Sequence, residues 1–336
     1  MNDIRPGLNS QRLVTLMEQS IKRCNLQLEN LKVLTEAATG AYVVTPVLAA
    51  MAGAKKVFAI TRSSRYGSVD IVIKNTKYLA EIAGVSDRIE FFSEKTKDVV
   101  AQADIITNSG HVRPIDAQMI GWIKPTAVIG LMYEAWEFRP EDVDLNICRQ
   151  RGIQVAGVNE RHPAVDVFSF LGIMAVKLLL DAGIAVYATN ILLLCDNPFS
   201  SFIESGLINA GATVDTVDSL TAAPTDKIYD AVLVALQPQQ EPVLSAKDAA
   251  MIAKYWPGVV VAQYWGDIER PAFSSHNVPV WPEIEPKPGH MAILPSGVGA
   301  EPIIRLQTGG LKAAEVIWRQ QFSELNQESL EFVQLV

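Results

Sequence analysis

The sequence predicts an α/β protein with two doubly wound domains, each built on a parallel sheet, joined by a long helix. Short apolar runs alternate with amphipathic segments along most of the 336 residues, as strands alternate with helices around a parallel sheet. This length is too great for one ordinary core. Both halves begin with an apolar run, a turn, a small-residue helix and a second apolar run. We therefore expect two similar units.

The N-terminal segment, 1–30, is predicted to be a helix over residues 10–30. Leu13, Leu16, Met17 and Ile21 share one helical face, and Ser10 is the expected N-cap. The first domain should then occupy residues 31–162. Its expected strands are Val33–Glu36, Val57–Thr61, Ile89–Phe92, Asp104–Asn108, Ala127–Met132 and Ile153–Val158. Its expected helices are Ala41–Ala52, Val69–Ala83, Thr96–Ala101, Ile115–Trp122 and Pro140–Gln150.

A linker helix is predicted within residues 163–185, running from Ala164 to Ala182. The second α/β domain should follow over 186–310. Its expected strands are Asn190–Leu194, Thr213–Val217, Ala231–Ala235, Val259–Gln263 and Val278–Trp281, with helices Phe199–Ala210 and Ala246–Tyr255. The C-terminal segment, 311–336, belongs to a helix that begins near Glu301 and is open to a break at Gly309-Gly310. We expect this helix to pack on the first domain or on a second copy of the chain.

Composition limits the classes of function. The hydrophobic fraction is 49%, the charged fraction is 20%, and the net charge is −8. An acidic surface argues against nucleic acid and anionic membranes as partners, because both attract clustered Lys and Arg. Three cysteines without paired spacing, and no apolar signal core at the start, predict a cytoplasmic protein with reduced thiols. No metal-ligand spacing occurs. We expect a small-molecule substrate, no metal, and a homo-oligomer such as a homodimer.

The turn after the first strand is the principal candidate for a nucleotide site. Thr39, Gly40, Ala41 and Tyr42 lie where a dinucleotide fold carries its glycine-rich turn, before a helix whose first amides could bind a phosphate. Only one glycine of the three in that pattern is present. The alternative interpretation is a Rossmann-like shape that no longer binds a nucleotide.

The residues after the second strand favour NADP over NAD. Arg62, Ser63 and Arg65 stand where an NAD site usually has an acid for the ribose. A guanidinium there suits a 2′-phosphate. The alternative is a solvated basic loop.

Residues 103–160 resemble the second half of the nicotinamide-binding domain of D-2-hydroxyacid dehydrogenases. They are also similar to ornithine cyclodeaminases and S-adenosylhomocysteine hydrolases. The matching motifs are Ala103-Asp104-Ile105-Ile106 and Ile123-Lys124-Pro125-Thr126-Ala127-Val128. This resemblance implies a Rossmann fold and an NAD(P)-dependent oxidoreductase. The sequence departs from the family at Met132–Trp136, where those dehydrogenases usually carry a catalytic arginine.

A second resemblance points to a different cofactor. Residues 33–42, with Glu36 and Gly40, resemble the first motif of S-adenosylmethionine-dependent methyltransferases, and residues 75–94 resemble the segment that follows their second strand. The alternative functions are therefore a methyltransferase that uses S-adenosylmethionine, or a cofactor-free Rossmann-like binding protein.

The candidate catalytic residues follow predicted strands, at the edge where open α/β sheets bind ligands. Asn108 and Ser109 are expected to contact the cofactor. His111 could exchange a proton and Arg113 could hold a substrate carboxylate or carbonyl in a cleft between the domains. Glu134, beside Trp136, is a candidate acid, and His162 should line the same cleft. The plainer alternatives are a loop pin for His111, a solvent-facing Glu134 and a helix cap at His162.

The second domain offers fewer candidates. Asp196 to Ser200 occupy the turn after its first strand, and an Asx turn is favoured there over a ligand site. Glu283, Glu285, His290 and Trp265-Gly266-Asp267 lie in or near a Pro- and Gly-rich stretch that could border a site.

Overall fold

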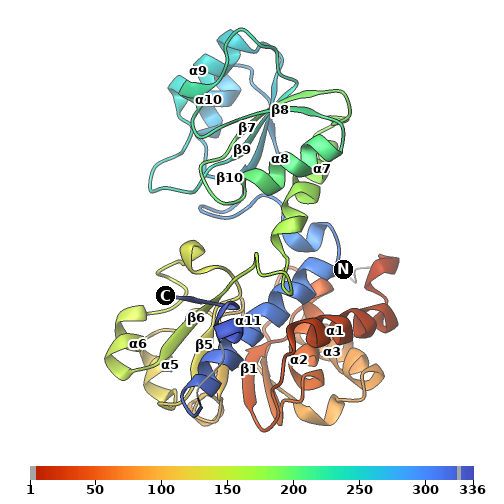
Figure 1. Ribbon diagram of the computed structural model, residues 1–336, viewed down its shortest axis with the longest axis vertical. Coiled ribbons are helices and arrows are strands. Elements are labelled where there is room, and N and C mark those ends of the chain that lie inside the picture. The colour runs from red at the N-terminus through yellow and green to blue at the C-terminus, as the bar shows by residue number, and fades with distance from the viewer. Residues whose placement is uncertain (1–4, 324–326) are drawn as a thin grey trace. The chain divides into compact units, whose positions relative to one another are not determined.

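The computed structural model describes residues 5–323 and 327–336, and it confirms the predicted fold class (Figure 1). The chain forms two compact units: Met1–Val167 with Gly299–Val336, and Phe168–Val298. Each unit is an α/β structure built on its own sheet. Among the described residues, no helix is long and apolar enough to cross a membrane.

The first unit contains a seven-stranded sheet in the order β12-β6-β5-β4-β1-β2-β3. Its strands are β1 (Lys32–Glu36), β2 (Lys56–Ile60), β3 (Ile89–Phe92), β4 (Ile105–Thr107), β5 (Val128–Gly130), β6 (Gln154–Val158) and β12 (Val333–Leu335). Neighbouring strands from β3 to β6 run parallel, and β12 lies antiparallel against β6. The strand order reverses between β1 and β4, which is the topological switch point of a doubly wound sheet.

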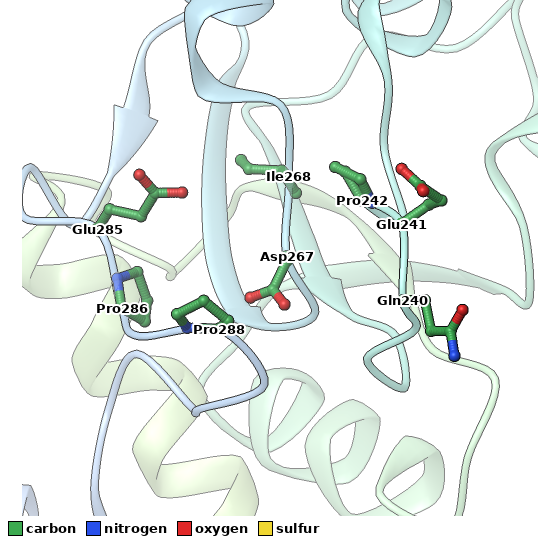
Figure 2. A pocket seen from close by; sticks show the side chains of 8 residues that line it. All are labelled: Gln240, Glu241, Pro242, Asp267, Ile268, Glu285, Pro286 and Pro288. Carbon is green, nitrogen blue, oxygen red and sulfur yellow. The ribbon is translucent and has the colours of Figure 1, made fainter.

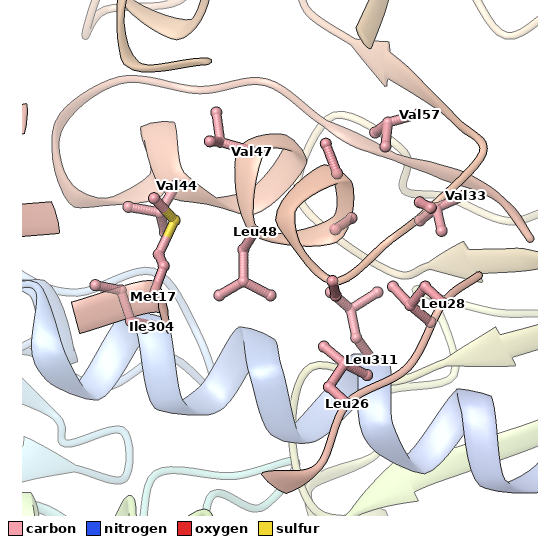
Figure 3. Close-up of a cluster of buried hydrophobic side chains, with 14 of the residues drawn as sticks. Met17, Leu26, Leu28, Val33, Val44, Val47, Leu48, Val57, Ile304 and Leu311 are labelled. Atoms are coloured by element: carbon pink, nitrogen blue, oxygen red, sulfur yellow. The ribbon is translucent and has the colours of Figure 1, made fainter. Parts of the chain in front are cut away.

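Helices cover both faces of this sheet. One face carries α1 (Ser10–Cys24), α2 (Val44–Met51), α3 (Val69–Ile82) and α11 (Glu301–Gln320), and the other carries α4 (Lys97–Val100), α5 (Ala117–Trp122) and α6 (Leu145–Arg151). Figure 3 shows Met17 of α1, Leu48 of α2 and Leu311 of α11 in the cluster of buried side chains on the first of these faces. The C-terminal helix therefore packs on the first domain, which is one of the two predicted alternatives. A further short helix, α12, spans Gln327–Leu330.

The second unit contains a five-stranded parallel sheet in the order β11-β10-β9-β7-β8. Its strands are β7 (Asn190–Leu194), β8 (Thr213–Val217), β9 (Ala231–Ala235), β10 (Val260–Trp265) and β11 (Val280–Trp281). Its helices are α7 (Leu171–Asp181), α8 (Ser200–Asn209), α9 (Ala246–Tyr255) and α10 (Arg270–Ser275). Helices α7 and α8 lie side by side (Figure 1) and meet at Gly172 and Gly206.

The predicted N-terminal helix was too long. Helix α1 ends at Cys24, because Asn25 adopts a left-handed conformation with φ 45°. Its N-cap is Asn9 and not Ser10, since the Asn9 side chain accepts a hydrogen bond from the Arg12 amide at 2.9 Å.

The predicted linker helix over residues 164–182 is also wrong at its start. Helix α7 begins at Leu171, after a single 3₁₀ turn at Phe168–Phe170. The preceding residues form a turn in which Asp166 has φ 52°. Arg305 of α11 donates to the backbone oxygen of Asp166 at 3.1 Å and so holds this turn on the first unit.

Other differences come from caps and from long-range pairing. Helix α6 begins at Leu145 and not at Pro140, because the Asp144 side chain caps it by accepting from the Ile147 amide at 3.1 Å. Helix α11 is not broken at Gly309-Gly310. A Cβ at Gly310 would lie 2.3 Å from Met132 Cε, so a glycine there allows close packing on the sheet. The short elements α10 and β12 were not predicted.

Candidate functional site

The turn between β1 and α2 lies at the switch point of the first sheet. Gly40 has φ 62°, a left-handed conformation that glycine adopts without strain, and it opens a 3₁₀ turn, Gly40–Val43, that leads into α2. Ala41 is buried, whereas Thr39 and Tyr42 are half-buried. The predicted nucleotide turn thus has the strand, turn and helix geometry that such a site needs.

The segment after β4 crosses the same edge. The Asn108 side-chain oxygen accepts the Met132 amide at 2.8 Å, while its Nδ2 is buried without a partner among the described residues. The Ser109 hydroxyl lies 3.3 Å from the hydroxyl of Thr35 and also pairs with Thr107. Asn108 and Ser109, which were predicted to contact the cofactor, are therefore buried polar groups at the switch point.

Glu36, the last residue of β1, is held by this segment. It is only 7% exposed, and its Oε2 accepts the His111 amide at 2.9 Å. A Cβ at Gly110 would lie 3.1 Å from the same oxygen, so a larger residue there would crowd the carboxylate. The dehydrogenase interpretation gave Glu36 no role, although the structure places it beside His111 and the Gly40 turn.

Arg113 is committed to an ion pair inside the first unit. Its Nη1 lies 2.9 Å from Asp142 Oδ2, and the same oxygen accepts the Tyr133 hydroxyl at 2.9 Å. Burial and the Asp142 carboxylate both raise the pKa of Tyr133 above its usual range. This network fixes the loop after β4 against the segment after β5. It leaves only the other guanidinium nitrogens of Arg113 for a substrate.

Of the two arginines after β2, Arg62 is the better candidate for an anion. The Arg65 guanidinium folds over the Tyr66 ring, 4.7 Å from its centroid. Arg62 is exposed and lies near Lys95, whose pKa is lowered by burial and further by Arg62, although Asp116 opposes the shift. Ser63 accepts the Val69 amide at 3.3 Å and so connects this loop to the start of α3.

Three glutamates gather beyond the carboxyl ends of β5 and β6. Glu134 is fully buried and accepts the Trp136 indole N–H at 2.5 Å, the Glu160 amide at 3.0 Å and Arg161 Nε at 3.2 Å. Burial and the Glu134 carboxylate raise the pKa of Glu137 to about 7. Burial, Glu137 and Glu134 raise the pKa of Glu160 well above its usual range.

Of the three glutamates, Glu137 and Glu160 are thus the ones with raised pKa values, and the sequence did not single them out as acids. Glu134 does not face water, because its carboxylate is enclosed. His162 locks the nearby turn: its Nδ1 accepts the Ala164 amide at 3.1 Å, and its ring stacks on Phe332 at 3.8 Å between centroids. No helix begins there for His162 to cap.

Side-chain hydrogen bonds hold the turn at the switch point of the second sheet, between β7 and β9. Asp196 Oδ1 accepts the Gln237 amide at 2.8 Å, and Asn197 Nδ2 donates to the Ala235 oxygen at 2.7 Å. Asn197 Oδ1 also accepts the Phe199 amide at 3.1 Å, which confirms the predicted Asx turn. Side-chain hydrogen bonds to the backbone therefore occupy the turn after β7.

A hollow of about 420 Å³ lies at the edge of the second unit (Figure 2). Two predicted residues, Asp267 and Glu285, line it together with Glu241 and three prolines. Asp267 also accepts the Gly289 amide at 2.9 Å. His290 is exposed and does not line this hollow. Among the described residues, no group of His, Cys, Asp or Glu side chains is arranged to hold a metal ion.

No protein-family model matches the chain, and no curated protein sequence matches it. Solved structures do match in fold. One chain of the dipicolinate synthase from Bacillus halodurans is 10% identical, with a TM-score of 0.56, over 89% of this chain and 100% of that one. A dipicolinate synthase chain from Bacillus subtilis is 11% identical, with a TM-score of 0.54 over 89% and 100%.

An NAD-dependent formate dehydrogenase from Staphylococcus aureus, solved in complex with NAD, is 11% identical with a TM-score of 0.51. The alignment covers 91% of this chain and 98% of that one. At such low identity these likenesses establish the fold alone. The predicted resemblance to NAD-binding dehydrogenases is thereby confirmed at the level of the fold.

Proposed function

We propose that the chain is an NAD(P)-dependent oxidoreductase that binds its nucleotide on the first unit. The observation that carries this proposal is the Gly40 turn at the switch point of a sheet whose strand order is that of dinucleotide-binding folds. The fold that the chain shares with a formate dehydrogenase solved with NAD supports it. The proposed substrate is a small molecule that bears a carboxylate or a carbonyl.

The residues at this edge fit a nucleotide. Two buried polar atoms lack partners among the described residues there: Asn108 Nδ2 after β4 and Thr61 Oγ1 after β2. A buried polar atom without a hydrogen-bond partner lowers the stability of the folded protein, and a bound ligand can supply that partner. The Gly40 turn and the start of α2 would hold the diphosphate, and Arg62 with Ser63 would hold a 2′-phosphate. When bound, the nicotinamide supplies hydride transfer.

The remaining residues would manage protons and orientation. The His111 ring would exchange a proton with the substrate oxygen. Glu36 accepts the backbone amide of His111 and so holds this residue in place. The Asp142 ion pair positions Arg113 beside that histidine. Burial and the neighbouring carboxylates raise the pKa values of Glu137 and Glu160, so these two acids would hold protons beside the Glu134–Arg161 contact.

Glu36 favours one other candidate function. A carboxylate at the end of β1 would repel a diphosphate but would attract a ligand with hydroxyl donors or a positive charge. S-adenosylmethionine is such a ligand. Titration of the protein with NADPH, followed by nicotinamide fluorescence, separates the two. The absence of binding at millimolar NADPH, with thermal stabilisation by S-adenosylmethionine, would favour the transferase.

Arg62→Ala is expected to weaken NADPH binding about tenfold and to leave NADH binding within about twofold of wild type. A charge-assisted hydrogen bond to phosphate accounts for a change of this size. Fluorescence titration of both cofactors measures it. Arg149→Ala, an exposed arginine of α6, is the matched control and should change neither affinity. Equal losses for both cofactors in Arg62→Ala would show that Arg62 does not contact a 2′-phosphate.

A further inference from the structure

Glu36 is a buried carboxylate at the switch point of the first sheet, and only one of its two oxygens is used. The residue is 7% exposed, and its Oε2 accepts the His111 amide at 2.9 Å. Its Oε1 accepts no hydrogen bond from any residue that the structure describes. Burial of a charged group without a full set of partners is costly. A donor on a ligand would supply the partner that Oε1 lacks.

Arg113 offers the opposite charge from the loop after β4. Its Nη1 is held by Asp142 at 2.9 Å, and the same Asp142 oxygen accepts the Tyr133 hydroxyl at 2.9 Å. Within the described part of the chain, Nη2 and Nε of Arg113 donate to no partner. The guanidinium is therefore fixed by one nitrogen, and its other donors remain for a carboxylate.

Gly110 lies between these two charged groups. A Cβ at Gly110 would lie 3.1 Å from Glu36 Oε2 and 3.9 Å from Arg113 Nη2. The carboxylate and the guanidinium therefore flank one side of this exposed glycine, where no side chain covers them. They do not pair with each other, because the ion-pair partner of Arg113 among the described residues is Asp142. The His111 ring, which follows in the chain, makes no hydrogen bond to a described residue.

We propose that this edge binds the ammonium and carboxylate groups of a small α-amino acid. Glu36 accepts the ammonium through Oε1, and Arg113 donates to the carboxylate through Nη2 and Nε. An α-amino acid carries both charges on one carbon, so a single molecule reaches the groups on both sides of Gly110. This inference names the substrate class of the redox site, and it rests on the proposed function for the claim that the amino acid is a substrate.

An ammonium at Glu36 also changes the charge that a nucleotide meets. Glu36 ends β1, shortly before the Gly40 turn that is proposed to hold the diphosphate. Its carboxylate alone would repel that diphosphate, whereas a bound ammonium offsets the repulsion. The same buried anion is thus compatible with an amino acid and a nucleotide on one edge of the sheet.

The test uses 2-amino-4,4,4-trifluorobutyrate as the probe, with binding followed by fluorine NMR in the presence and absence of NADPH. The wild-type protein should bind it saturably, and at least about fivefold more tightly than 4,4,4-trifluorobutyrate, which lacks the ammonium. Glu36→Gln keeps an oxygen that can accept the His111 amide. It should weaken the amino acid about tenfold without weakening trifluorobutyrate, because only the ammonium loses its counter-charge.

Glu18→Gln, at an exposed glutamate of α1, is the matched control and should bind both probes like wild type. Arg113→Lys keeps the positive charge but loses the planar fork, so it should weaken both probes. Equal binding of the two probes by the wild type under both conditions, or an unchanged amino-acid affinity in Glu36→Gln, overturns the proposal. NADPH titration is an independent readout. A protein that binds NADPH without preferring the amino acid keeps the redox function and loses this inference, and one that prefers the amino acid without binding NADPH shows the reverse.

Discussion

Gly206→Ala is expected to lower the free energy of unfolding of the second unit by about 3 kcal/mol. Helices α7 and α8 approach so closely that a Cβ at Gly206 would lie 2.3 Å from the Gly172 Cα and 2.7 Å from its carbonyl carbon. These are backbone atoms, so no side chain can rotate to make room. Separation of the helices would open voids around Leu207 and Ile203, which are fully buried.

The direction of this effect opposes helix propensity. In an exposed helix, replacement of glycine by alanine stabilises by about 1 kcal/mol. Ser205→Ala, at the adjacent exposed position of α8, is the control and should change stability by less than about 0.5 kcal/mol. Urea unfolding followed by tryptophan fluorescence measures both. A Gly206→Ala protein as stable as wild type would show that α7 and α8 do not pack this closely.

Much of the fold could be predicted because parallel strands are apolar on both faces. The runs at β2, β7 and β9 therefore stand out from the polar loops around them. Element ends were harder to predict, because they depend on caps such as Asn9 and Asp144 that compete with equally plausible neighbours. Strand β12 has three residues and forms only through its pairing with β6, which no local pattern reveals.

The candidate site could be predicted in position but not in its contacts. Strand ends place His111, Arg113 and Glu134 at one edge of the sheet. The partner of Arg113, Asp142, lies 29 residues away in a loop that was assigned to a helix. Likewise Glu160 lies next to Glu134 only because β5 and β6 are neighbours. Such pairings depend on strand order, so residue types alone did not identify Glu137 and Glu160 as the acids with raised pKa values.

The free energy of unfolding of the first unit is expected to fall by about 3 kcal/mol between pH 5 and pH 8. Folding raises the pKa of Glu137 from 4.5 to about 7, through burial and the Glu134 carboxylate. The folded state therefore binds more protons than the unfolded state over this range, so stability is lost as pH rises. A change from 4.5 to about 7 corresponds to about 3 kcal/mol. Glu160 titrates together with Glu137, so the two share the effect.

The Glu137→Gln variant tests whether Glu137 causes this pH dependence of stability. Glutamine mimics the protonated acid, so the variant should match wild type near pH 5 and exceed its stability at pH 8, which flattens the pH profile. Arg139 opposes the shift at Glu137, and Arg161 pairs with Glu134. Glu81→Gln, on the exposed side of α3, is the control and should keep the wild-type slope. If Glu137→Gln keeps that slope as well, the pH dependence arises elsewhere, for instance at the histidines, and the three glutamates do not hold an excess proton.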